Sequence, residues 1–238
     1  MIEKKLLVSR EPRLANDLFW LMVDELHDRL RLSAAASEAG LAAALLAELV
    51  IQDSSVAMRG GVVSVLRYQD PGSGVYWPAP PRDPVALAVY DRVVAEPDVR
   101  GVGERLAVLA RDSTRLVAWR LAQAGALTVT HHRRRAAYRS LDMNRSGTPA
   151  VRLRLRWKRS TSLDRAALFA DLHDLVLCSI AAEIGLIGEL VGDGVPDAVS
   201  AAVVRHVRSF VAATDSALGP LLSLIAPLVS DGVLSFRR

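Results

Sequence analysis

The stretch Gly40-Leu-Ala-Ala-Ala-Leu-Leu-Ala-Glu-Leu49 is small and apolar almost all round. A helix that is apolar on every side is buried, because a helix that faces water keeps a polar side. We therefore expect residues 39–51 to form a helix at the centre of a bundle. The length of 238 residues is enough for one large domain or two small ones, burying about 70% of the unfolded surface.

Helical spacing of apolar residues continues on both sides of this stretch. It predicts one amphipathic helix over residues 14–30 and further helices over 83–94 and 103–124, the latter ended by Gly125 as a C-cap. Towards the end of the chain, the same spacing predicts helices over residues 163–169, 172–191 and 196–218, followed by a proline-broken apolar end.

Strand patterns are few and short. Residues 54–66 predict a hairpin that turns at Gly60-Gly61, and residues 126–130 predict a strand. Residues 151–157 alternate between apolar and cationic side chains, which predicts a half-buried strand. We interpret residues 68–84, with five prolines, as a long surface loop. The expected fold class is mostly α: a single-domain helical bundle with surrounding amphipathic helices and a protruding basic β-hairpin, with residues 1–13 as a short N-terminal lead and residues 14–238 as the helical domain.

The chain has one cysteine and no clear membrane span. Cys178 cannot form an internal disulfide or a multi-cysteine metal site, so we expect a buried thiol in a reducing compartment. The first apolar run is three residues long, which is too short for a signal peptide. Residues 175–191 contain two glutamates and residues 218–229 contain two prolines, so we expect neither to cross a bilayer.

The formal net charge of +4 conceals an uneven distribution. Residues 131–160 contain ten Lys or Arg and one acid, Asp142, which gives +9 there and −5 on the rest of the chain. Such a field attracts polyanions, namely phosphate groups, anionic lipid head groups or nucleic acid. The alternative is a solvated loop in an arginine-rich protein, because the chain has 27 arginines and only three lysines.

Motifs for catalysis are weak. Gly101-Val-Gly103 lacks the third glycine of a dinucleotide fingerprint, and neither a Gly-Lys-Ser/Thr loop nor a Gly-x-Ser-x-Gly elbow occurs. The tetrads Glu25-Leu-His-Asp28 and Asp171-Leu-His-Asp174 lie on predicted helices, but a metal site needs three or four convergent ligands. We therefore predict no catalytic residue, metal or cofactor, and rank a metal-dependent hydrolase as the least favoured interpretation.

Apolar residues interrupt the basic arm at residues 131–150. Tyr138, Leu141 and Met143 among arginines are typical of a peripheral membrane contact, in which apolar tips enter the interface and arginines bind anionic head groups. A helix over residues 113–124 followed by a basic hairpin is also typical of a winged-helix module that binds nucleic acid. These two interpretations differ in the partner, and the residues leave both open.

Three stretches together resemble the Golgi phosphoprotein 3 family. The first combines Leu18-Phe-Trp-Leu-Met-Val-Asp-Glu-Leu with the stretch at residues 40–49. The second is Arg120-Leu-Ala-Gln-Ala-Gly-Ala-Leu-Thr, followed after a basic hairpin by Asp142-Met143. The third is the helical tail from about Leu168. The resemblance covers most of residues 14–213.

The resemblance implies a mostly helical, non-enzymatic peripheral membrane protein. By that resemblance it would bind phosphatidylinositol 4-phosphate or a related inositol phospholipid with arginines, and insert its hairpin beside the head group. The family's first head-group arginine falls on Ala42 and its tryptophan on Ser33. Of its second pair of arginines, one matches Arg111 and the other falls on Thr114, with Arg115 adjacent.

We therefore predict anionic phospholipid as the partner, a membrane enzyme as a candidate client, and nucleic acid only under the winged-helix alternative. The predicted head-group contacts are Arg111, Arg115, Arg133, Arg134 and Arg135, and the predicted inserted tip is Tyr138, Leu141 and Met143. Coat binding and Golgi location are not expected, because the domain begins near residue 14. The preference for arginine over lysine is typical of a GC-rich bacterial genome, which favours the cytoplasmic face of the cytoplasmic membrane.

Overall fold

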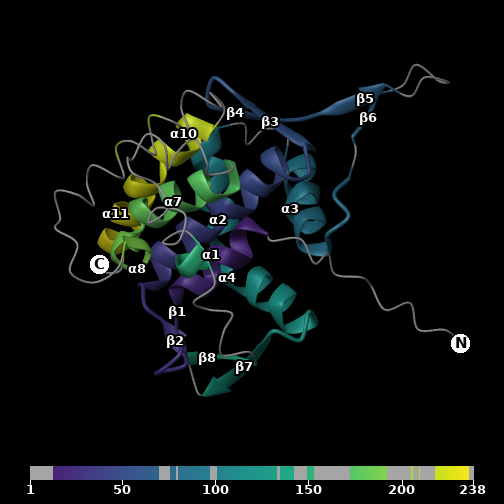
Figure 1. Cartoon of the computed structure of the whole chain (residues 1–238). Helices are drawn as coiled ribbons and strands as arrows, with labels where there is room; N and C mark the ends of the chain where they lie inside the picture. The colour runs from purple at the N-terminus through teal and green to yellow at the C-terminus, as the bar shows by residue number, and fades with distance from the viewer. Residues whose placement is uncertain are drawn as a thin grey trace, which may run out of the picture.

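Helix α2 (Ala34–Ile51) runs through the middle of the structure, a computed structural model, and other helices pack around it (Figure 1). The structure describes residues 13–69, 76–78, 80–96, 101–132, 135–141, 149–152, 172–191, 205, 209 and 218–235. The expected mostly α, single-domain bundle is confirmed. The elements in chain order are α1 (Leu14–Met22), β1 (Val23–Asp24), β2 (Arg29–Leu30), α2, β3 (Val56–Arg59), β4 (Val62–Val65), β5 (Arg67–Gln69), β6 (Tyr76–Pro78), α3 (Pro84–Ala95), α4 (Val102–Gln123), β7 (Leu127–His132), β8 (Arg135–Ser140), α7 (Leu172–Glu183), α8 (Ile187–Val191), α10 (Leu218–Ser223) and α11 (Ile225–Ser235).

Helix α2 is buried along residues 39–49, as the sequence predicts. Ser33 begins the helix, and its hydroxyl accepts a hydrogen bond of 3.3 Å from the amide of Ala36, which would otherwise be unpaired. Gly40 lies so close to the chain after α7 that a Cβ there would stand 2.8 Å from Ile184 Cδ1. By length and composition α2 could cross a membrane, but most of it is buried by the rest of the bundle, as in a core helix.

Helix α1 is shorter than predicted. The helical spacing extends through residue 30, but α1 ends at Met22 and the chain forms the two-stranded β1–β2 hairpin. The side chain of Asp24 accepts from the amide of Leu26 at 3.2 Å, which stabilises a turn in place of another helical turn. Leu26, which continues the apolar spacing, is 90% exposed. The predicted helix over residues 14–30 is therefore wrong beyond Met22.

The predicted helices over residues 83–94 and 103–124 are confirmed as α3 and α4. Asp83 caps α3 by accepting from the amides of Val85 and Ala86 at 3.1 and 2.8 Å, and Pro84 occupies the first helical position, where no amide hydrogen is needed. Helix α4 packs along α2 and ends before Gly125, whose φ of +65° allows the chain to turn back into β7.

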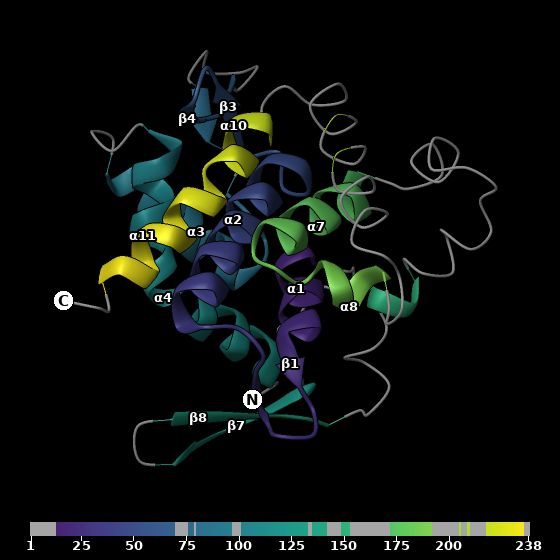
Figure 2. The same cartoon turned by 90° about the vertical axis from the view of Figure 1, so that its left-hand side faces the viewer.

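Two antiparallel hairpins lie at opposite ends of the bundle in both views (Figures 1 and 2). The predicted hairpin at Gly60-Gly61 is confirmed as β3–β4, and β7–β8 forms the second. The interpretation of residues 68–84 as a loop is wrong in part, because Tyr68 pairs with Trp77 in the β5–β6 ladder.

The C-terminal part consists of helices in its described residues. The predicted helix over 172–191 is broken at Gly185 into α7 and α8. Cys178 on α7 is buried as expected, and burial raises the pKa of its thiol. Residues 163–169 and most of 196–218 lie outside the described residues.

The predicted strand over residues 151–157 is wrong in the two residues of it that the structure describes. Residues 149–152 are helical, and residues 153–157 lie outside the described part of the chain. Arg152 donates to Asp17 at 2.8 Å and to Asp174 at 2.7 Å. These ion pairs hold Arg152 against α1 and α7, so it does not form part of an exposed cationic strand face.

A buried charge cluster joins four of the helices. Arg120 on α4, with a side chain only 2% exposed, donates two hydrogen bonds of 2.9 Å to the carboxylate of Glu48 on α2. It also donates to the α3 cap Asp83 at 3.1 Å and to Asn16 on α1 at 2.8 Å. Glu48 in turn accepts from the amide of Ala15 at 2.8 Å. Arg120 thus faces two buried carboxylates, and Arg13, with Nη1 3.9 Å from Glu48, adds a second positive charge beside them.

We expect Arg120→Ala to lower the free energy of unfolding by about 3–5 kcal/mol, because it removes the cation that contacts both buried carboxylates and leaves Glu48 with Arg13 at 3.9 Å. Urea denaturation followed by circular dichroism measures the change. The control is Arg115→Ala on the same helix, because Arg115 is 74% exposed and its pair with Asp112 is worth no more than about 1 kcal/mol. Equal losses for the two variants would contradict a structural role for the cluster.

Candidate functional site

A cleft of about 940 Å³ opens between α4, the β7–β8 hairpin and the segment from β2 to the start of α2. The hairpin crosses one end of the bundle, next to the C-terminal end of α4 (Figure 1). The residues that line the cleft are Arg29, Leu30, Leu32, Ala34, Ser37, Glu38, Arg111, Thr114, Arg115, Ala118, Trp119, Ala122, Val129, His131, Ala136 and Tyr138.

Helix α4 supplies one wall of the cleft. Arg111, Arg115 and Trp119 are spaced four residues apart, which places them on one stripe of the helix. The other side of α4 is buried and includes Arg120. The predicted head-group residues Arg111 and Arg115 therefore do line one cleft, and they lie on the opposite side of α4 from the charge cluster.

The β7–β8 hairpin supplies the facing wall. Val129 pairs with Tyr138, and His131 pairs with Ala136, so all four side chains are on the face that lines the cleft. The amide of Tyr138 donates to the carbonyl of Asp28 at 2.8 Å, which attaches β8 to the β1–β2 hairpin. This bond fixes the hairpin against the body of the protein.

The third wall brings an arginine and a carboxylate into the cleft. Arg29 lies on β2 and has a side chain 65% exposed, with Nε 3.8 Å from Asp24. Glu38 lies on the first turns of α2 and is half-buried. Burial raises the pKa of the Glu38 carboxyl, and the negative charge of Asp112 raises it further.

Asp112, at the rim of the cleft, links α4 to α3 through an ion pair. It accepts from Arg92 at 2.7 Å and from Arg115 at 3.0 Å. The hydrogen bonds from Arg92 and then Arg115 lower the pKa of Asp112, so it stays ionised at neutral pH. Arg115 is thereby oriented at the cleft rim while most of its side chain remains exposed.

Of the three residues predicted to insert into the membrane, the structure describes Tyr138 and Leu141, and these lie in different parts of the hairpin. Tyr138 is in the middle of β8, and its ring packs edge-on against Phe19 with centroids 5.4 Å apart. It belongs to the cleft wall, because the alternation of β8 turns it towards the core, and it does not fit the predicted inserted tip. Leu141 is 60% exposed but lies at the base of the hairpin, where its amide donates to Ala126 O at 3.0 Å. Met143 lies outside the described residues.

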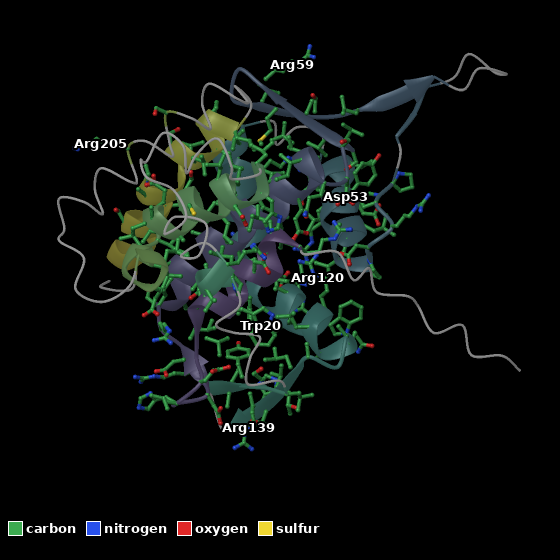
Figure 3. All side chains as sticks on the ribbon, viewed as in Figure 1. Trp20, Asp53, Arg59, Arg120, Arg139 and Arg205 are labelled. Carbon is green, nitrogen blue, oxygen red and sulfur yellow. The ribbon has the colours of Figure 1, made fainter. Side chains whose placement is uncertain are left out.

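Of the predicted hairpin arginines, the structure describes the backbone of Arg135, at the far end of the ladder. Arg135 begins β8 and pairs with His132, whereas Arg133 and Arg134 lie outside the described residues. Arg139, further along β8, has a side chain 75% exposed, 3.9 Å from Asp28 (Figure 3). The described part of the hairpin thus carries a cation on its outer face.

Of the three sequence positions that differ from the family pattern, Ala42 and Ser33 lie outside the cleft lining and Thr114 lies in it. Ala42 is fully buried within α2, and Ser33 is the α2 cap. Sequence reasoning missed three residues that do line the cleft: Arg29, Trp119 and Glu38. For Trp119, the spacing of four residues from Arg115 was an available signal. His131, the first residue of the basic arm, is exposed and also lines the cleft.

Of the two tetrads that contain a histidine, only the second has its histidine on a helix. His27 is in the β1–β2 turn, where Nδ1 lies 2.7 Å from Asp24. His173 is on α7 as expected, and Nε2 lies 3.0 Å from Asp17. Within the described part of the chain, no group of three or more His, Cys, Asp or Glu residues is placed to hold a metal ion.

A family model described as Golgi phosphoprotein 3 (GPP34) matches residues 14–226, which is most of the chain. No curated protein matches the sequence.

The raised pKa of Glu38 predicts how the stability of the fold depends on pH. A carboxyl whose folded pKa is above the unfolded value of about 4.3 destabilises the fold when ionised, and the penalty disappears as the pH falls through the raised pKa. We expect Glu38→Gln to raise the melting temperature at pH 7 and to give no increase at pH 4. Differential scanning calorimetry across this pH range measures the difference. The exposed Glu25→Gln is the control, and the same pH-dependent gain in both variants would contradict the assignment.

Proposed function

This chain belongs to the Golgi phosphoprotein 3 family, and from that membership and the geometry of the cleft we propose that it is a peripheral membrane protein that binds anionic phospholipid. The observation that carries the proposal is the convergence of Arg29, Arg111, Arg115 and His131 on one cleft from three separate segments. We propose that the lipid head group binds there.

The charge of the cleft suits a phosphate. Three arginines and one histidine face a single carboxylate, Glu38, among the lining residues. The planar guanidinium groups of Arg111 and Arg115 can each donate two parallel hydrogen bonds to phosphate oxygens. Arg115 already has Asp112 as a partner, so a phosphate would share that guanidinium with it.

Exposed apolar side chains around the cleft support a membrane surface as the site of binding. Trp119 in the cleft is 48% exposed, Leu141 at the hairpin base is 60% exposed, and Leu26 on the adjacent β1–β2 turn is 90% exposed. Exposed tryptophan and leucine beside arginines favour an interfacial position, where the apolar groups leave water and the cations remain near head groups. We propose that this end of the bundle faces the lipid.

The proposed lipid is phosphatidylinositol 4-phosphate or a related inositol phospholipid, as family membership suggests. Ala42 and Ser33 cannot take the family's head-group roles, because one is buried and the other caps α2. Arg29 and His131 are the residues that we propose in their place, since both line the same cleft. Arg133, Arg134 and Arg135 would add charge at the hairpin end.

The shape of the site favours lipid over nucleic acid. In a winged-helix module, the recognition helix stands free to enter a groove. In this protein the outer stripe of α4 faces a cleft that the hairpin and the start of α2 enclose. We further propose a non-enzymatic role on the cytoplasmic face of the cytoplasmic membrane, with a membrane enzyme as a candidate client.

Removing the two cleft arginines tests the proposal. We expect Arg111→Ala/Arg115→Ala to weaken co-sedimentation with phosphatidylcholine vesicles containing phosphatidylinositol 4-phosphate roughly 30-fold, because each cation is worth about 1 kcal/mol near an anionic surface. The matched control is Arg59→Ala/Arg205→Ala, which removes the same charge far from the cleft (Figure 3). Equal weakening in both double variants would mean that vesicle binding depends on the overall charge and not on the cleft. Binding to duplex DNA without binding to vesicles would favour the nucleic-acid function instead.

The hairpin end has a separate test. We expect Arg133→Glu/Arg134→Glu/Arg135→Glu to reduce vesicle binding and to make the remaining binding less sensitive to salt, since fewer cations then meet the anionic surface. Co-sedimentation at 50 and 300 mM salt measures both effects. Unchanged binding at both salt concentrations would exclude the hairpin arginines from the membrane contact.

A further inference from the structure

Glu38 is an unexpected residue in a cleft that binds phosphate. It lines the same cavity as Arg29, Arg111 and Arg115, yet no cation of the described residues stabilises its carboxylate. Burial is the main cause of the raised pKa of Glu38, and the negative charge of Asp112 raises it further. Glu38 also contributes to the raised pKa of Tyr138, after burial, so the two lie near each other. An ionised Glu38 therefore lowers the stability of the folded protein, and it also lowers the affinity of the cleft for a phosphate alone.

A second polar group on the same turn also lacks a partner. The hydroxyl of Ser37 is fully buried and has no hydrogen-bond partner in the described structure, although Ser37 lines the cleft. A buried hydroxyl without a partner destabilises a protein unless a ligand or water satisfies it. At the start of α2, Ser37 thus presents a buried hydroxyl without a partner, and Glu38 presents a half-buried carboxylate with no cation partner among the described residues.

The chemistry of these groups limits the ligand. Glu38 needs a hydrogen-bond donor, and the Ser37 hydroxyl can use a donor or an acceptor. An ammonium group offers only donors, and the three arginines of the cleft would repel it. A ligand hydroxyl donates and accepts without charge. Trp119 adds a flat apolar surface against which the C–H face of a ring can pack.

We infer that Glu38 and Ser37 are specificity-determining residues, which bind the ring hydroxyls of a phosphorylated polyol while Arg111 and Arg115 bind its phosphate. The inference rests on the proposed function and adds to it: the arginines provide general affinity for phosphate, and Glu38 selects head groups that carry a ring with hydroxyl groups. A phosphate without such a ring leaves Glu38 facing an anion, so Glu38 acts against it.

The test compares two phosphomonoester lipids that differ in the ring. Vesicles of phosphatidylcholine contain either phosphatidylinositol 4-phosphate or phosphatidic acid, at concentrations that give equal surface charge. Co-sedimentation measures the affinities of the wild-type chain, Glu38→Ala, Glu38→Gln and the control Glu104→Gln, at an exposed position near the start of α4 and outside the cleft lining. Thermal unfolding establishes that each variant is folded, and Glu38→Gln retains a side-chain oxygen that can accept from a hydroxyl.

We expect the wild type to prefer the inositol lipid and Glu38→Ala to reduce that preference about tenfold, because a hydrogen bond to a charged acceptor is lost. Binding of phosphatidic acid by Glu38→Ala should stay the same or increase, and Glu38→Gln should retain part of the preference. Glu104→Gln should leave the preference unchanged.

Three outcomes would overturn the inference in different ways. If Glu38→Ala strengthens binding to both lipids by the same factor, Glu38 acts only by repulsion, and anionic lipid binding stands without polyol selection. If the wild type binds both lipids equally, the polyol inference fails while the broader function survives. If the wild type binds neither type of vesicle, the proposed function itself fails.

Discussion

The hydrogen-bonded cluster of Arg120, Glu48 and Asp83 is the constraint on which the rest of the structure depends. Its members come from α4, α2 and the cap of α3, and Asn16 and Ala15 add α1. A buried guanidinium requires carboxylates at fixed positions, so the cluster sets both the contact and the rotation of α4 on α2. Asp83 contributes twice, because the oxygen that caps α3 also accepts from Arg120.

The rotation of α4 decides where the cleft can form. With Arg120 turned into the core, the stripe of Arg111, Arg115 and Trp119 faces the cleft between the hairpin and the start of α2. The hairpin follows α4 directly after the turn at Gly125, and its attachment to the β1–β2 hairpin through Asp28 closes the other side. Parts of the chain far apart in sequence are thus held by a rigid helical core, which keeps the arginines in position before a ligand arrives.

The arginines of this chain serve at least two purposes. Arg120 and Arg152 are held by carboxylates inside or at the edge of the bundle and join helices. Arg29 and Arg115 keep exposed guanidinium groups at the cleft. The contrast explains why overall arginine content says little about function, whereas three arginines on one cavity point to an anion. Glu38 modifies that conclusion, because a carboxylate with no cation partner among the described residues indicates a ligand with neutral donors as well as a phosphate.

Local chemistry in the sequence determined much of the fold and one wall of the site. The small apolar residues at 39–49, the turn at Gly125 and the i, i+4 spacing of Arg111 and Arg115 act over a few residues and need no distant partner. Only the tertiary structure decided that α1 ends at Met22, that Arg152 joins two helices, and that Tyr138 faces the core. It also brought Arg29 and Glu38 into the cleft. The physical reason is that helical periodicity defines which residues share a face, but the partner of that face lies far away in the chain: Arg120 meets a carboxylate 72 residues earlier, and that contact fixes which side of α4 is left for the ligand.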